Sequence, residues 1–126
     1  KGPFLAAHFH SEWSHLFTPE GRIQMFKAVA TIMEWRPAYK ALIGNAWYYD
    51  PVVAGISPHL AYVRNYPEDN GASFFRSTPD RDGNALMSSR RRELQESGEY
   101  EPRKYLMVWP RRSLLSWFRR EFPVRT

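Results

Sequence analysis

The sequence contains no cysteine. This absence excludes disulfide bonds, zinc sites built on thiolates and enzymes with a cysteine nucleophile. The sequence also has no apolar run of about 18 residues, which a transmembrane helix would need, and its first residues do not resemble a secretory signal peptide. Internal repeats and low-complexity tracts are missing as well. We therefore expect a single domain over residues 1–126 and a cytoplasmic location.

The composition favours a folded domain with anionic partners. Of the 126 residues, 43% are hydrophobic and 16% aromatic, which is enough for a core. Eighteen Lys and Arg residues stand against 13 Asp and Glu residues, so the formal charge is +5. This excess suits nucleic acid, phosphorylated cofactors or acidic protein surfaces. Because the sequence begins at Lys1 and not at methionine, it could be the C-terminal part of a longer chain.

Patterns along the chain predict the element order β-α-β-β-β-α-β-α. This order indicates the α+β (α/β-like) class: a single domain with a mixed, mostly antiparallel sheet and flanking helices. Strand-forming residues and turn signals bound the strands, and helical spacing marks the helices. The predicted strands cover residues 3–10, 39–50, 59–66, 72–78 and 104–109, and the predicted helices cover residues 18–37, 82–97 and 110–122.

Two segments carry the clearest signals. Thr18 is a helix-capping residue, and Pro19 suits the first helical position. The run of residues 104–109, KYLMVW, is apolar enough for a strand that is buried on both faces. We therefore predict that this strand lies inside the sheet, with the side chains of residues 106–109 all largely buried.

Residues 79–94, PDRDGNALMSSRRREL, allow two interpretations. Gly83 would let an anion approach the backbone closely, at the start of a helix whose first N–H groups lack partners. Arg90 lies about two turns into the same predicted helix and could reach a phosphate. The other interpretation is an ordinary surface helix that Asp82 or Asn84 caps, with solvated arginines.

The element order and the loop DRDGNA, Asp80–Ala85, resemble the GNAT acyltransferase superfamily. In that superfamily a loop of the form Gln/Arg-x-x-Gly-x-Gly/Ala precedes a helix and holds the pyrophosphate of acyl-CoA. This chain matches the Gly-x-Ala part and departs at its first position, which is Asp80. The resemblance implies an acyl-CoA cofactor. Its cofactor-binding residues would be Arg81, Gly83, Asn84, Ala85 and Arg90.

An N-acyltransferase would transfer an acyl group from a CoA thioester to an amine. Tyr105 is the candidate for the general acid that protonates the leaving thiolate, as the resemblance implies, with Tyr100 as a second candidate. Asp50 or Glu34 could take the amine proton through water. The sequence does not identify the acyl group or the acceptor, and it leaves a homodimer open.

Two other functions remain open. His8, His10 and Glu12 share one face of a strand and could ligate zinc or iron in a metal-dependent enzyme. The basic helices around residues 90–92 and 111–120 could instead make a non-enzymatic module that binds nucleic acid or an acidic partner.

Overall fold

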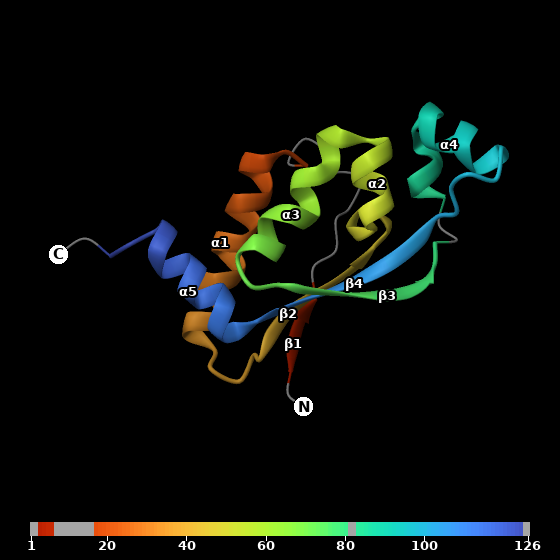
Figure 1. The fold of residues 1–126 in the computed structure, drawn as a ribbon. Coiled ribbons are helices and arrows are strands. Elements are labelled where there is room, and N and C mark those ends of the chain that lie inside the picture. The colour runs from red at the N-terminus through yellow and green to blue at the C-terminus, as the bar shows by residue number, and fades with distance from the viewer. Residues whose placement is uncertain (1–2, 7–16, 81–82, 125–126) are drawn as a thin grey trace.

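The computed structural model describes residues 3–6, 17–80 and 83–124. Within them, one mixed sheet carries helices on one face, with α5 at one end of the sheet and α4 near the other (Figure 1). The strands are β1 (Phe4–Ala6), β2 (Ala41–Ala46), β3 (Ser73–Pro79) and β4 (Arg103–Pro110). The α-helices are α1 (Pro19–Trp35), α2 (Pro51–Ile56), α3 (Ala61–Asp69), α4 (Ser89–Glu96) and α5 (Arg111–Glu121). Single 3₁₀ turns occur at η2 (Trp47–Tyr49), η3 (Pro58–Leu60) and η4 (Asn84–Met87).

The sheet has the strand order β1-β2-β4-β3. β1 and β2 are parallel and are connected through α1, whereas β4 is antiparallel to both β2 and β3. The predicted α+β class and the mixed, mostly antiparallel sheet are therefore confirmed. The interior position of the KYLMVW strand is confirmed too, since β4 lies between β2 and β3.

Helix α1 begins where its sequence predicts. The Thr18 side chain accepts a hydrogen bond of 2.9 Å from the backbone N–H of Gly21, and Pro19 occupies the first turn. Phe26, Ala30 and Met33 recur at helical spacing and are buried. They attach α1 to the sheet through the main core, where the Phe26 and Trp109 rings meet edge to face at 5.0 Å.

The predicted strand at residues 59–66 is wrong, because this segment is the turn η3 followed by helix α3. Alternating apolar residues over so short a run fit either structure. Helical spacing places Val63 and Pro67 in the core and brings Tyr62 and Tyr66 against it. Packing of this face against the core outweighs the strand propensity of the aromatic residues.

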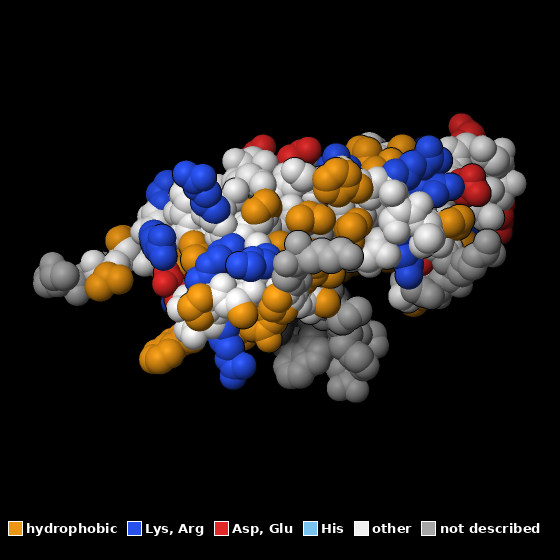
Figure 2. All heavy atoms as spheres, turned by 90° about the horizontal axis from the view of Figure 1, so that it is seen from below, with side chains coloured by type: hydrophobic (Ala, Val, Ile, Leu, Met, Phe, Trp, Pro, Cys, Tyr) orange, Lys and Arg blue, Asp and Glu red, His pale blue; other side chains and the backbone are white. Residues whose placement is uncertain are grey.

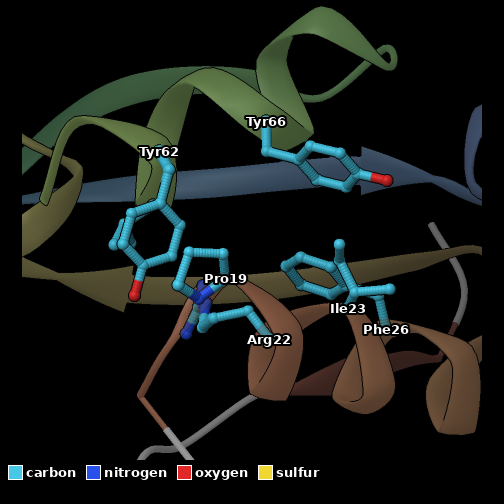
Figure 3. Close-up of a pocket in the computed structure, with 7 residues that line it drawn as sticks. Pro19, Arg22, Ile23, Phe26, Tyr62 and Tyr66 are labelled. Carbon is cyan, nitrogen blue, oxygen red and sulfur yellow. The ribbon is translucent and has the colours of Figure 1, made fainter.

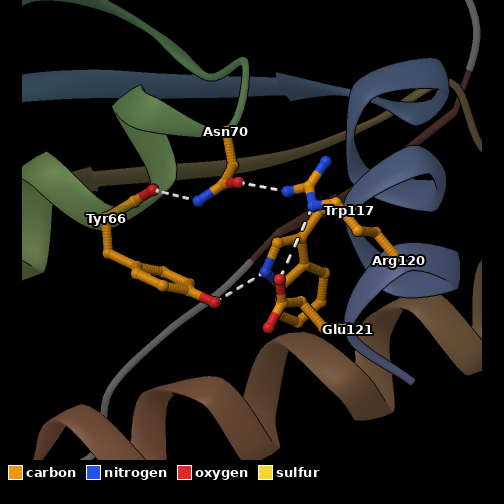
Figure 4. A network of polar contacts seen from close by, with 5 residues as sticks. All are labelled: Tyr66, Asn70, Trp117, Arg120 and Glu121. Atoms are coloured by element: carbon orange, nitrogen blue, oxygen red, sulfur yellow. Dashed lines mark hydrogen bonds and ion pairs between the residues drawn. The ribbon is translucent and has the colours of Figure 1, made fainter.

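The C-terminal end of α3 is held by a polar network with α5 (Figure 4). The Trp117 indole donates a 2.7 Å hydrogen bond to the Tyr66 hydroxyl. The Asn70 side-chain amide donates to the backbone carbonyl of Tyr66 at 2.8 Å, and its oxygen accepts from the Arg120 guanidinium. The Trp109 indole donates to the backbone carbonyl of Asn70. These contacts connect α3, α5 and β4. Because the partners come from separate segments of the chain, no local sequence pattern predicts the contacts.

The predicted helix at residues 82–97 is divided. Gly83 has φ +80° at the start of η4, and the chain leaves helical geometry at Ser88. A new helix, α4, then begins at Ser89, with the Ser88 hydroxyl accepting from the Arg91 N–H at 3.3 Å. Gly98, with φ +83°, follows the helix, as the sequence predicts. The first residue of α4 is therefore six positions beyond Gly83.

The two faces of β4 differ in burial. Met107 and Trp109 are fully buried beneath the helices, whereas Leu106 and Val108 are only half-buried on the opposite face. The predicted alternation of the four side chains is confirmed, and Leu106 and Val108 are less completely buried than Met107 and Trp109. The described helices cover only one face of the sheet, and Figure 2 shows apolar side chains at the surface of the other. On that face Phe75 is 54% exposed.

We expect Met107→Ala to lower the free energy of unfolding by about 2–5 kcal/mol, because it opens a cavity in the core. Leu106→Ala should cost clearly less, since its side chain is already partly exposed. Urea denaturation of both variants measures the difference. Equal losses would contradict the assignment of a covered and an open face.

Candidate functional site

Residues 47–50, which we call the aromatic turn, lie where β2 ends and α2 begins. Trp47, Tyr48 and Tyr49 form η2, and Asp50 caps α2 by accepting a 3.0 Å hydrogen bond from the Val52 N–H. The local sequence explains this geometry, because Asp followed by Pro is a strong helix-start signal. Three arginines from three different helices converge on this turn.

The first of them, Arg22 of α1, is 4% exposed. Its Nη2 donates a 2.8 Å hydrogen bond to the Tyr49 hydroxyl. The guanidinium carbon lies 5.3–5.9 Å from the ring centroids of Phe17, Phe26, Tyr48 and Tyr49. These are cation–π distances. Burial raises the pKa of Tyr48 to about 12, so this phenol stays protonated beside the cation.

The second, Arg64 of α3, lies between the aromatic turn and the sheet. Its Nη1 donates to the Tyr49 carbonyl at 2.9 Å, and its guanidinium covers the rings of Phe74 at 4.6 Å and Tyr105 at 5.7 Å. The Glu68 carboxylate, one turn along α3, pairs with it at 3.5 Å. Arg64 therefore joins the start of α2 to the inner face of β4.

Asp50 is a buried carboxylate with positively charged arginine side chains around it. It is 6% exposed, and burial raises its pKa above the usual value. The hydrogen bond from Val52 and the charges of Arg64, Arg103 and Arg76 oppose this rise without cancelling it. A buried carboxylate of raised pKa is a better proton acceptor than an exposed one, and such groups are common in active sites.

The third, Arg91 of α4, is 5% exposed and points inward. Its Nε donates to the Ala85 carbonyl at 2.6 Å and its Nη1 to the Ser57 hydroxyl at 2.7 Å, while the guanidinium lies 4.4 Å from the Trp47 ring centroid. Burial lowers the pKa of Arg91. This arginine attaches the η4–α4 segment to the aromatic turn and is not available to a ligand in solution.

The structure brings some of the candidate site residues together. Arg64 covers the Tyr105 ring and donates to the carbonyl of Tyr49, the residue before Asp50. Ala85 packs with Val53 and Tyr100 in a small second core. Burial also raises the pKa of Tyr100 to about 12.

Other candidate residues lie elsewhere. Glu34 is at the far end of α1, where it pairs with Arg119 of α5 at 3.0 Å. Gly83 and Asn84 begin η4, and Arg90 is exposed on α4. The remaining candidates lie outside the described residues: His8, His10, Glu12 and Arg81.

The arginines of the aromatic turn were not predicted from the sequence. Arg22 did carry a signal, since residues 22, 26, 30 and 33 fall on one helical face that is otherwise apolar. Arg91 carried none, because nothing in a run of three arginines shows which of them turns inward.

Among the described residues, no group of three His, Asp or Glu side chains is placed to hold a metal ion. In the same part of the chain no helix has the length and apolar character needed to cross a membrane. Comparisons of the chain with models of protein families, with curated proteins and with solved structures gave no match.

Replacing Asp50 by Asn should make stability depend less on pH. The folded-state pKa of Asp50 is raised above 3.8, so the folded chain holds this proton more tightly than the unfolded chain does. The linked stability is therefore present below about pH 4 and is lost as pH rises through the folded pKa. Because Asn is also a good helix cap, Asp50→Asn should gain stability relative to the wild type as pH rises.

Urea unfolding between about pH 3 and pH 7 measures this difference. Asp50→Ala is the control, since it removes the cap and should lose about 1 kcal/mol relative to Asp50→Asn at every pH. A constant difference between the wild type and Asp50→Asn over this range would show that the carboxylate carries no desolvation cost.

Proposed function

We propose that the protein is an N-acyltransferase-like enzyme that transfers an acyl group from a CoA thioester to an amine. The observation that carries the proposal is the placement of Asp50 and Tyr105. They are 55 positions apart in the sequence, yet Arg64 lies against both places: its guanidinium covers the Tyr105 ring, and it donates to the carbonyl of Tyr49, the residue before Asp50. Ala85, at the end of the DRDGNA loop, belongs to the second core.

The donor would bind at the loop that contains Gly83. This residue has a left-handed backbone, and no heavy atom lies within 4 Å of the position that a Cβ would take. The open space suits the close approach of a phosphate to backbone amides. Arg90, exposed on α4, supplies a positive charge nearby, with Asn84 and Ala85 on the same loop and Arg81 just before it. Asp80 lowers the affinity of this loop for an anion.

In the reaction, the amine nitrogen attacks the thioester carbonyl carbon, and the C–S bond breaks in the collapse of the tetrahedral intermediate. Asp50 accepts the amine proton through a water molecule, helped by its raised pKa. The Tyr105 hydroxyl donates its proton to the leaving thiolate and is then reprotonated from solvent. Arg64, which covers the Tyr105 ring, contributes positive charge beside the developing oxyanion. Glu34 has no part in this arrangement because it lies at the far end of α1.

The basic helices offer less support for a nucleic-acid module. Most of their guanidinium groups bind groups of the chain itself. Arg111 donates to the carbonyls of Arg36 and Tyr39, and Arg119 pairs with Glu34. Arg120 contacts Asn70 and Glu121, and Arg91 is buried. An extended strip of free cations along α4 and α5 is therefore not formed, and we favour the enzyme over this alternative.

Binding of CoA is the first test. At about 100 times its dissociation constant, CoA should stabilise the fold by roughly 2.7 kcal/mol, seen as a higher melting temperature. Gly83→Val should remove this gain, because a branched side chain fills the space beside the loop. Gly98→Val is a matched control, since Gly98 has almost the same φ and the same open surroundings. It should keep the response to CoA.

Catalysis is the second test, with acetyl-CoA, a panel of primary amines and thiol release as the readout. Asp50→Asn should lower kcat about 100-fold or more, the usual contribution of a general base, and Tyr105→Phe should lower it by a smaller factor. Glu34→Gln should leave the rate unchanged. If neither CoA nor acetyl-CoA shifts the melting temperature of the wild type, the proposed function is wrong.

A further inference from the structure

At the end of the sheet where β2 begins, three segments of the chain come together: the start of β1, the loop between α1 and β2, and the start of α5 (Figure 1). Backbone hydrogen bonds connect them. The Lys40 N–H donates to the Pro3 carbonyl at 2.9 Å, and the Arg111 N–H donates to the Lys40 carbonyl at 2.8 Å. The Arg111 guanidinium also donates to the carbonyls of Arg36 and Tyr39. We call this end of the molecule the basic tip; it comprises residues 3–4, 32–40 and 110–112.

The basic tip carries an excess of positive charge. Arg36, Lys40 and Arg112 are exposed, and within the described residues none of them forms an ion pair with a carboxylate. Glu34 is the one carboxylate of the tip. It is already paired with Arg119 at 3.0 Å. The charge of the tip is therefore complemented only by an anionic partner.

Large apolar side chains are exposed among these charges. Trp35 is 82% exposed, Phe4 48% and Ile32 44%. Ile32 and Trp35 lie three positions apart on α1, which places them on the same side of the helix. Figure 2 shows the molecule from below, where apolar and basic side chains lie together over the left half with few Asp or Glu side chains between them. The surface is both apolar and cationic.

Earlier in α1 the apolar side chains have partners. Figure 3 shows Ile23 and Phe26 facing Tyr66 of α3 across a cavity of about 50 Å³. Phe26 also packs into the main core. Ile32 and Trp35, in the last turn of the helix, are instead exposed to solvent. Packing of α1 against the rest of the domain therefore does not explain why these two residues are apolar.

We propose that the basic tip docks on the surface of an anionic lipid bilayer. Trp35 enters the boundary between headgroups and acyl chains, where an indole keeps its ring among carbon atoms and its N–H in water. Ile32 and Phe4 enter beside it. Arg36 and Lys40 remain at the level of the lipid phosphates and carboxylates, which attract them. The buried apolar area and the electrostatic attraction together hold the protein on the surface.

The apolar residues favour a bilayer over a nucleic acid. Bases stack on aromatic rings, so Trp35 and Phe4 suit both partners. Ile32 has no π-system on which a base can stack, and its exposed surface is stabilised by transfer from water to an apolar phase. An acyl-chain boundary provides that phase beside the anionic groups, whereas a nucleic acid backbone provides only the anionic groups.

This inference does not depend on the proposed acyl transfer. Strand β2 begins at the basic tip and ends at the aromatic turn, so a bilayer at the tip leaves Asp50 at the opposite end of the strand. Binding to lipid is measured without CoA, and either proposal can fail while the other stands.

The experiment is co-sedimentation of the full chain with lipid vesicles. One set contains phosphatidylcholine alone, and in the other about a third of the lipid is phosphatidylserine. We expect binding to the anionic vesicles at about 0.1 M sodium chloride and its loss at about 0.5 M, because salt screens the attraction. Vesicles of phosphatidylcholine alone should bind far less protein.

Variants test the two contributions separately. Trp35→Ala should weaken binding to anionic vesicles about tenfold, through loss of the apolar area that enters the boundary. Replacing Arg36 and Lys40 together by Gln should weaken it about fivefold for each lost cation and reduce its dependence on salt. All three side chains are exposed, so these variants should fold normally.

Matched controls lie on the η4–α4 segment, away from the tip. Met87→Ala removes an apolar side chain that is 79% exposed, and Arg92→Gln removes an exposed arginine. Both should bind vesicles as the wild type does. The proposal is overturned if anionic vesicles do not bind the protein at low salt, or if Trp35→Ala binds them unchanged. Binding of a single-stranded RNA in place of vesicles, lost in Trp35→Ala, would assign the tip to nucleic acid and overturn it too.

Discussion

Helices α1, α3 and α4 each reach the aromatic turn through one arginine. Arg22 lies among its tyrosine rings, Arg64 bonds to the Tyr49 carbonyl, and Arg91 covers Trp47. The planar guanidinium suits this task because it can stack on a ring and donate hydrogen bonds at its edge in the same position. Since the turn is continuous with β2, the three contacts fix the helices relative to the sheet. The relative positions of Asp50, Tyr105 and Ala85 depend on them.

This arrangement gives the interior around the turn an excess of positive charge. Three buried or largely buried arginines surround it, and Asp50 is the buried carboxylate among them. Asp50 is not placed to neutralise Arg22, and its own pKa is raised by burial. Apolar side chains of similar volume would avoid the desolvation cost of these cations. Their presence is understandable if they position other groups, as these three arginines do at the aromatic turn.

The sequence predicted those elements whose signals are local. The cap at Thr18 and Pro19 located α1, and the apolar run at residues 104–109 located β4 inside the sheet. Residues 59–66 were wrongly predicted because their identity as helix α3 comes from contacts with α1 and α5, such as the bond from Trp117 to Tyr66. The lesser burial of Leu106 and Val108 was not predicted, because a hydrophobic run does not reveal how many faces of a sheet are covered.

The candidate site shows the same division between local and long-range information. The sequence offered Asp50 only as one of two carboxylates that could take the amine proton, and the fold buries it. The sequence offered Glu34 as an equally good candidate, yet at the end of α1 its carboxylate forms an ion pair with Arg119. No local pattern separates these two carboxylates. What separates them is the desolvation of Asp50 beside the aromatic turn, and desolvation is a property of the assembled core.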